Sequence, residues 1–524
     1  MRHRLSSLPR PVVAGVLIFL MAFGLYATTT WELPGYEPET AAVTEGFVQE
    51  GHFWDVEDPA LPSLRAYLQG KGGHFYARAG LLQPLLEAPF FAAGHFVDGH
   101  FGWTEPYPYR LVFLWFYNPF IAALAAVALF AFVYQIRRSL SWAVVIGALF
   151  TGASIAWPYS KMGMETTFML ALLASFALAA WARRSTTTGP WLAVGFAAGA
   201  MAATKPYAGV LVFPLAIYLW PTWISYDGRR RWRALIAAAV PALLWVVAIG
   251  WYNWDRFGSV TDFGYTEFAL TLSMPLNVLG LFFSPGKGLL FYSPLVVLGA
   301  LGVPAMWRED RWLTVALLTA LLILACLSGA STYWGDEVWG PRYLVAAAWA
   351  LLVPIAWWAT TSTRRRVLVG VTVVAVLVQV IGVSAYYGTY IPVVQKLTGV
   401  AVYGDRFSNV ETEDIPYGDD PTRWIPELSP LLLQAEGLIS TEVISRFGGK
   451  GLEATYHPFE GRSRTVNLSE PEVRMEFNFF WNNLLDKAWA KVFAALMFLM
   501  SLASGFGLYR LVRTESQGPR RSSA

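Results

Sequence analysis

The chain has 524 residues, of which 55% are hydrophobic and only 14% carry a formal charge, whereas a soluble globular protein carries about 25% charged residues. This composition excludes an ordinary soluble enzyme. The net charge of +3 comes with basic residues in short groups beside apolar runs, which excludes a nucleic-acid-binding surface. The only cysteine, Cys326, excludes an intramolecular disulfide.

Long apolar runs recur along the whole chain, and a run of about 18 residues or more is typical of a membrane-spanning helix. We therefore predict an all-α polytopic membrane protein with about twelve transmembrane helices. The first run follows a basic N-terminus, as in a cleaved signal peptide. Its length, and the lack of a small-residue cleavage site after it, favour a retained span. The twelve runs are centred on 11–27, 108–135, 141–157, 164–182, 189–203, 206–222, 234–252, 288–307, 312–330, 343–361, 367–388 and 487–511.

Arginines predict the orientation of these spans. Cytoplasmic loops carry an excess of Lys and Arg, and the clusters fall in alternate loops, which places both termini in the cytoplasm. The localisation that we expect is a bacterial inner membrane. The clusters are Arg137–Arg138, Arg183–Arg184, Arg229–Arg231 with Arg233, Arg308 with Arg311, Arg364–Arg366, and Arg510, Arg513, Arg520 and Arg521.

Two long loops then lie on the outer side. We predict a transmembrane core over residues 1–390, with its first outer loop at 31–107. An extracytoplasmic loop or small domain at 391–486 has a strand-like end and reads as a small α/β segment. The last span at 487–511 leads to a cytoplasmic tail at 512–524.

The first outer loop begins with two acids, Glu37 and Glu39, on either side of Pro38. Proline suits the first turn of a helix, and Gly51 is a typical C-terminal stop. We predict a short interfacial helix between them, with Ala42, Val43 and Phe47 facing the bilayer. The positive end of that helix keeps a carboxylate ionised, which is the form that a general base requires. The alternative is that both acids only cap the helix.

Farther along this loop, an apolar stretch interrupted by prolines predicts a second surface or re-entrant element around 74–89. Three polar side chains at its start are candidate substrate contacts, although such residues also commonly face lipid headgroups. They are His74, Tyr76 and Arg78.

Single cations also occur on the outer side, each in a turn rich in Gly, Pro or aromatic residues. A polar group held at this depth is by default a candidate functional residue, and Lys and Arg are common phosphate partners. Each could instead extend to the headgroups. The five are Lys161, Lys205, Arg256, Lys287 and Arg342. Glu165, four residues after Lys161, lies at helical pairing distance from it and is a further candidate, as is Tyr343.

The motifs of several function classes are missing. The sequence has no Walker A loop, dinucleotide fingerprint or Gly-x-Ser-x-Gly, which disfavours a nucleotide-driven pump and the direct use of nucleotide sugars. The six histidines are scattered, and no metal-ligand cluster stands out. No cofactor is predicted, and a divalent metal at the two glutamates is left as an open alternative.

In this order and topology, several motifs resemble the GT-C glycosyltransferases, integral-membrane enzymes that use polyprenyl-phosphate sugars. The protein O-mannosyltransferase-like and lipid A aminoarabinose transferase branches are the most similar. The resemblance extends from the first span to about Tyr343 and fades beyond residue 390. It is carried by Gly35–Glu39, Phe75–Pro89, Pro158–Lys161 with Glu165, Tyr252–Asn253 with Arg256–Ser259 and Gly264–Tyr265, Ser284–Pro294 and Trp334–Tyr343.

The resemblance implies an inverting transfer in which a carboxylate of the first outer loop takes the proton of the acceptor. Glu37 matches the acid of that family, and Arg342, Lys287 and Lys205 would bind the phosphate. The family usually has Asp here, often as an adjacent acidic pair, whereas this chain has Tyr36 at one of those positions. The base is therefore open between Glu37 and Glu39, and the case for a bridging metal is weakened.

We therefore expect a glycosyltransferase that moves a sugar from a polyprenyl-phosphate donor to an acceptor hydroxyl on the extracytoplasmic face. The acceptor would be a polysaccharide, lipid or protein, and membrane lipids are the other partners. The alternative is a transporter or flippase of a lipid-linked saccharide. Transporters often contain internal repeats and polar groups at mid-membrane, and neither is evident here.

Overall fold

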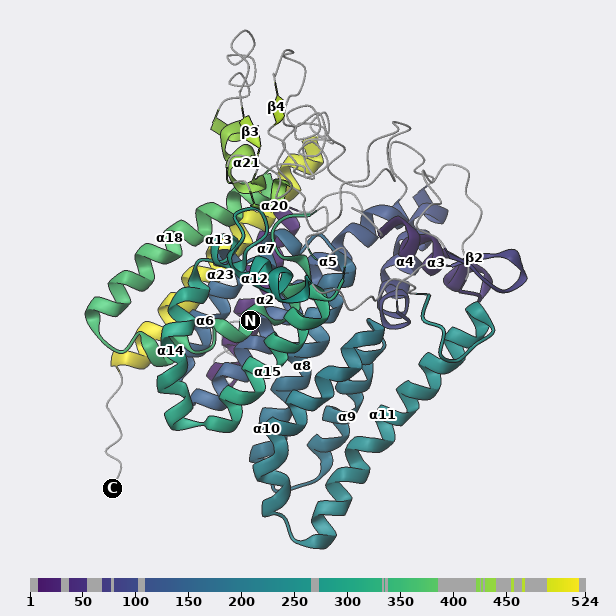
Figure 1. The fold of residues 1–524 in the computed structure, drawn as a ribbon, viewed down its shortest axis with the longest axis horizontal. Coiled ribbons are helices and arrows are strands. Elements are labelled where there is room, and N and C mark those ends of the chain that lie inside the picture. Colours follow the sequence, from purple (N-terminus) through teal and green to yellow (C-terminus); the bar gives the residue numbers. More distant parts are fainter. Residues whose placement is uncertain are drawn as a thin grey trace.

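The computed structural model describes residues 8–29, 37–53, 68–76, 80–101, 109–264, 273–331, 334, 338–384, 421–424, 426, 429–439, 454–456, 464–466 and 488–517. Helices make up most of these segments (Figure 1). They are α2 (Arg10–Thr28), α3 (Glu37–Glu50), η2 (Lys71–Gly73), α4 (Leu82–Phe101), α5 (Tyr109–Arg137), α6 (Leu140–Ala153), α7 (Ala156–Tyr159), α8 (Gly163–Arg184), α9 (Gly189–Ala202), η3 (Pro206–Leu211), α10 (Val212–Ser225), α11 (Gly228–Phe257), α12 (Met274–Phe283), α13 (Leu289–Tyr292), α14 (Leu295–Glu309), α15 (Arg311–Gly329), η4 (Arg342–Leu344), α16 (Val345–Ala348), η5 (Trp349–Leu351), α17 (Ile355–Trp358), α18 (Ser362–Ser384), α20 (Pro421–Trp424), α21 (Pro430–Ile439) and α23 (Ala488–Gln517).

Strands are few and short in the described residues. The strands β1 (Leu68–Gln69) and β2 (Phe75–Tyr76) form one antiparallel pair, and β3 (Ala454–Tyr456) and β4 (Arg464–Val466) form another. The second pair lies within residues 391–486, where the sequence predicted strand-like structure. Most of residues 391–486 lies outside the described part.

The apolar runs are helical, as predicted. In the described part of the chain, eight helices are long and apolar enough to cross a membrane, namely those at 10–28, 112–137, 163–184, 207–225, 228–257, 311–329, 362–384 and 491–514. Shorter apolar helices occupy 140–153, 189–202, 274–283 and 342–358. The chain is therefore an all-α polytopic membrane protein. The sequence did not predict α12, and α23 continues to Gln517, beyond the predicted end of the last span.

The run predicted as one span at 343–361 is broken into short helical segments from η4 to α17. Its backbone packs directly on α14, where a Cβ added at Gly299 would lie 1.5 Å from the Leu351 carbonyl oxygen. Small residues allow such close approach between membrane helices. The segment is almost wholly buried, and it begins with Arg342, which bonds to Glu165 at the end of α8 opposite Arg183.

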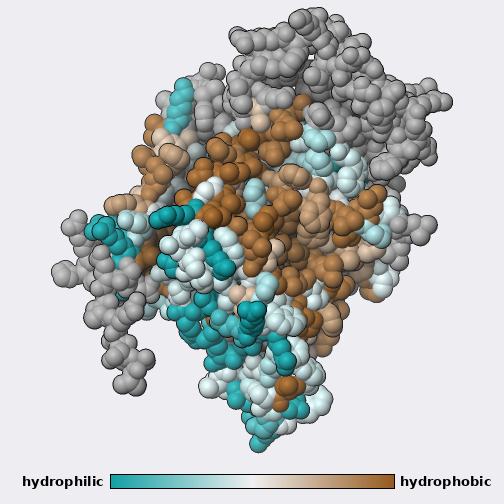
Figure 2. Space-filling model, turned by 60° about the vertical axis from the view of Figure 1, so that its left-hand side comes forward, coloured by the Kyte–Doolittle hydropathy of each residue, from teal (hydrophilic) through white to brown (hydrophobic). Residues whose placement is uncertain are grey.

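The arginine-bearing helix ends meet at one end of the bundle. Arg137 at the end of α5 pairs with Glu309 at 3.0 Å, and Arg183 at the end of α8 pairs with Asp310 at 2.8 Å. Figure 2 shows a hydrophilic zone at this end, below a hydrophobic band. The elements α3, α4, α20 and α21 lie at the opposite end (Figure 1). This is the relative arrangement that alternating arginine clusters predicted, and the cytoplasmic assignment stays a prediction.

The first outer helix, α3, ends where the sequence predicted, because Gly51 adopts a φ of 78°. The prediction that Ala42 and Val43 face the bilayer is wrong, since they are only 2% and 0% exposed. Both pack inside the protein, because α3 lies against α4. A polar bond joins the two helices, in which the Thr44 hydroxyl donates to Glu87 Oε2 at 2.9 Å.

Candidate functional site: a buried carboxylate between two cations

Glu165 lies in the first turn of α8 and is buried. The helix starts at Gly163, and the Thr166 hydroxyl donates to the carbonyls of Met162 and Gly163 at 3.0 Å. The N-terminal end of a helix carries a partial positive charge. The position of Glu165 therefore favours its ionised form.

Lys205 reaches Glu165 from the junction of α9 and η3. It precedes Pro206 and has an extended backbone, as residues before proline prefer, which takes it out of both helices. Its Nζ donates to Glu165 Oε1 at 2.7 Å. Around it stand the rings of Phe168, Tyr207 and Tyr343, with centroids 5.7 to 5.9 Å from Nζ.

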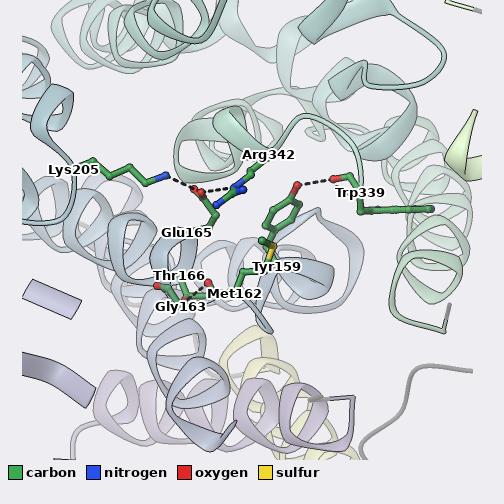
Figure 3. A network of polar contacts seen from close by, with 8 residues as sticks. All are labelled: Tyr159, Met162, Gly163, Glu165, Thr166, Lys205, Trp339 and Arg342. Atoms are coloured by element: carbon green, nitrogen blue, oxygen red, sulfur yellow. Dashed lines mark hydrogen bonds and ion pairs between the residues drawn. The ribbon is translucent and has the colours of Figure 1, made fainter. Parts of the chain in front are cut away.

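Arg342 completes the cluster from the start of η4. Its Nε donates to the same oxygen, Glu165 Oε1, at 2.8 Å, so the carboxylate lies between the two cations (Figure 3). The turn before it depends on Gly340, whose φ is 60° and whose added Cβ would lie 2.7 Å from the Tyr292 ring. The same turn is anchored by the Tyr159 hydroxyl, which donates to the Trp339 carbonyl at 2.7 Å.

We call Glu165, Lys205 and Arg342 the ionic triad. Their side chains are 1%, 3% and 7% exposed, so water screens their charges little. The triad carries a formal surplus of one positive charge. Removing one partner from a buried ion pair typically costs about 3–5 kcal/mol, because it leaves an uncompensated buried charge.

The predicted pairing of Lys161 with Glu165 does not form. Since α8 begins at Gly163, Lys161 belongs to the turn before the helix, and its Nζ donates to the Val383 carbonyl at 3.0 Å. Lys287 is fully buried and donates to the Val338 carbonyl. Both lysines thus brace backbone near the triad, and Lys287 contacts the segment that leads to Arg342.

Arg256 lies in a different cluster, at the C-terminal end of α11. Its Nη2 donates to Asn253 Oδ1 at 2.8 Å, and its guanidinium lies 3.9 Å from the Tyr252 ring centroid. Tyr76 is buried beside this cluster, packed against Phe257. The structure therefore brings two of the five predicted cations to one carboxylate and places Arg256 with another group.

The remaining candidates are positioned as follows. Glu37 and Glu39 are in the first turn of α3, but their side chains lie outside the described part, as does the whole of Arg78. His74 is exposed in the turn before β2. Tyr343 follows Arg342 and borders the triad.

Among the described residues, sequence reasoning missed one buried carboxylate besides Glu165, namely Glu87 on α4. It accepts bonds from Thr44 on α3 at 2.9 Å and from Gln83, one turn away, at 2.8 Å. The available signal was the spacing of Gln83 and Glu87 on an otherwise apolar helix. Glu87 fixes the helix that carries Glu37 and Glu39.

The triad offers a phosphate two kinds of partner. Arg presents a planar group of donors, whereas Lys presents a compact point charge. Glu165 Oε1 is the one hydrogen-bond acceptor of Lys205 Nζ among the described residues, and an ammonium group has three donors. In the same residues, no three His, Cys, Asp or Glu side chains come together as metal ligands would.

No protein-family model matches the chain, and no curated protein matches it. The solved structures that are similar to it include two of ArnT and one of an oligosaccharyltransferase. The structure of ArnT from Cupriavidus metallidurans in the apo state has a TM-score of 0.46 at 13% identity. The structure of the same protein bound to undecaprenyl phosphate has a TM-score of 0.45 at 12% identity. Each match covers 96% of this chain and 76% of the ArnT chain. The Archaeoglobus fulgidus oligosaccharyltransferase, in complex with zinc and sulfate, has a TM-score of 0.44 at 12% identity, over 80% of this chain and 61% of its own. At these values nothing about the function is inferred from the likeness. The function is inferred from the residues of the site.

Proposed function

We propose that this protein is an inverting glycosyltransferase that moves a sugar from a polyprenyl-phosphate donor to an acceptor hydroxyl on the extracytoplasmic face of a bacterial inner membrane. The observation that carries the proposal is the ionic triad, a buried cluster with surplus positive charge at the end of α8 opposite Arg183. Such a site suits an anionic headgroup whose lipid tail remains among the membrane helices.

In the reaction, the acceptor oxygen attacks the anomeric carbon from the side opposite the phosphate. The bond from that carbon to the phosphate oxygen breaks, and its electron pair stays on the phosphate. Lys205 and Arg342 stabilise this growing charge, and fixed charges in a dry site do so without reorganisation. Lys287 supports the Arg342 turn through the Val338 carbonyl.

The proton of the acceptor goes to a carboxylate of α3, and Glu37 is our first choice over Glu39. Support for this assignment comes from the helix itself, which starts at Glu37 and therefore favours an ionised acid there. Its packing on α4 through Thr44 and Glu87 keeps the helix in place.

The experiment is sugar transfer from a polyprenyl-phosphate donor by purified protein, with Glu37→Gln and Glu39→Gln compared with wild type. Glu50→Gln, at the exposed end of the same helix, is the matched control. We expect Glu37→Gln to lose about a hundredfold or more in rate, the contribution typical of general base catalysis, and Glu50→Gln to stay near wild type.

Full activity in both Glu37→Gln and Glu39→Gln would contradict the proposed base. If no donor were turned over but a lipid-linked saccharide crossed liposome bilayers that contain the protein, the transporter alternative would replace the enzyme.

A further inference from the structure

The ionic triad contains an anion as well as two cations, so a phosphate that binds there meets a negative charge already in place. Both cations bond to one oxygen of Glu165, at 2.7 and 2.8 Å. A bound phosphate would accept hydrogen bonds from the same two side chains, Lys205 and Arg342. Glu165 is thus not only a neighbour of the phosphate site but also a competitor for it.

Glu165 is the counter-ion of Lys205 and Arg342. Lys205 and Arg342 are buried at 3% and 7% exposure, and buried charges need a partner. The carboxylate supplies that partner and holds both side chains in place before the donor arrives. Because it is itself only 1% exposed, its negative charge remains close to any anion that enters.

The donor and the spent carrier differ in charge. The phosphate in the donor is a diester with one negative charge, whereas the released polyprenyl phosphate is a monoester with about −1.5 to −2 at pH 7. Two buried cations alone would therefore bind the product more tightly than the donor. A resident carboxylate repels the product more strongly than it repels the donor.

We propose that Glu165 is a positioning residue that alternates with the donor phosphate as the counter-ion of Lys205 and Arg342, and so weakens the binding of the spent polyprenyl phosphate and speeds its release. The inference rests on the proposed function. It assigns to the carboxylate a role in turnover, beyond that of an ion pair that only stabilises the fold.

The test is direct binding of polyprenyl phosphate to purified wild type, Glu165→Gln and Glu165→Asp, with uncharged polyprenol as the control ligand. We expect Glu165→Gln to bind polyprenyl phosphate about tenfold more tightly than wild type, Glu165→Asp to fall between them, and polyprenol to bind all three alike. In the transfer assay, Glu165→Gln should lower KM and kcat together and become more sensitive to inhibition by added polyprenyl phosphate.

Thermal unfolding gives a second reading that does not require turnover. Without ligand, Glu165→Gln should melt below wild type, because Lys205 and Arg342 lose the carboxylate that balances their charge. With saturating polyprenyl phosphate, its rise in Tm should exceed that of wild type, since a tighter ligand stabilises more. If Glu165→Gln folds only when polyprenyl phosphate is present during purification, this extreme case supports the same conclusion.

A purely structural ion pair gives the opposite pattern. In that case Glu165→Gln binds polyprenyl phosphate as wild type does or more weakly, with an equal or smaller rise in Tm, and the inference is overturned. Failure of the proposed function is distinguishable, because wild type itself would then bind polyprenyl phosphate no better than polyprenol.

Discussion

Arg342 Nε donates a 2.8 Å bond to Glu165 Oε1, although 177 residues separate the two in the sequence. The bond joins the first turn of α8 to the broken segment that starts at η4. Both partners are buried, and Lys205 shares the same oxygen.

Neutralising either cation of the triad should abolish most transfer. We expect Lys205→Gln and Arg342→Gln each to lower kcat by about a hundredfold, the loss typical when one donor to a developing oxyanion is removed. Lys71→Gln is the control, because Lys71 is exposed and stacks on Trp254. Near-normal rates in both triad variants would show that the donor phosphate lies elsewhere.

A methyl group at Gly340 should disturb the Arg342 turn. Gly340→Ala meets a φ of 60° and a Tyr292 ring 2.7 Å from the new Cβ, so we expect a loss of about 1–3 kcal/mol of stability and reduced transfer. Gly370→Ala on α18 is the matched control, since its Cβ would meet nothing within 4 Å. Thermal unfolding and the transfer assay measure both effects. Equal behaviour of the two variants would contradict the assigned turn.

The contact between α3 and α4 should matter for both stability and activity. Thr44→Val removes the hydroxyl that donates to Glu87, and losing one buried hydrogen bond costs about 1 kcal/mol. We expect a lower Tm together with slower transfer, because α3 carries the predicted base. Gln49→Ala, on the exposed side of α3, should change neither. If Thr44→Val lowered the Tm but left the transfer rate unchanged, the contact between α3 and α4 would matter for stability and not for catalysis.

Stability should depend on pH through Lys161. Burial lowers the pKa of Lys161 from 10.5 to about 7, so the unfolded chain binds the proton more tightly than the folded one. Stability therefore rises between pH 7 and pH 10.5 and does not change from this source below pH 7.

The Tm of wild type relative to Lys161→Met should accordingly increase from pH 7 to pH 9 in detergent. Lys491→Met, which removes an exposed lysine, should follow the wild-type curve. If the Tm of wild type and of Lys161→Met changed with pH in parallel, the lowered pKa of Lys161 would be refuted.

Sidedness can be checked with single cysteines in a Cys326→Ala background. Thr187→Cys lies at the arginine-rich end and Thr261→Cys at the triad end, and both positions are exposed. In intact cells, a membrane-impermeant maleimide should label Thr261→Cys, while Thr187→Cys should react only after lysis. The reverse pattern would invert the predicted orientation.

Much of the fold follows from composition and periodicity, because a continuous apolar run of about 20 residues can span a bilayer as a helix with all backbone hydrogen bonds inside the segment. Periodicity does not say whether an apolar face contacts lipid or protein, so it places Ala42 and Val43 in the wrong environment. The broken segment after Arg342 packs its backbone at Leu351 against Gly299. This contact joins segments that are distant in the sequence, so local periodicity does not predict it.

The candidate site was predictable in its members but not in its pairing. Lys205 and Arg342 stood out because cations are rare at the outer ends of spans. Local spacing predicts a pair between Glu165 and Lys161, but α8 begins at Gly163, so Lys161 is not in the same helix. Its true partners lie 40 and 177 residues away, and no local pattern carries such information.

The triad also bears on how the chain enters the membrane during synthesis. Glu165 and Lys205 lie at the two ends of the α8–α9 hairpin, so an anion and a cation can pair as soon as both helices have left the ribosome. A neutral pair lowers the cost of placing charged groups near lipid. Arg342 lies 177 residues after Glu165, so it is translated later and brings the surplus positive charge. A nascent chain that ends before Arg342 thus carries the α8–α9 hairpin with one balanced pair of charges.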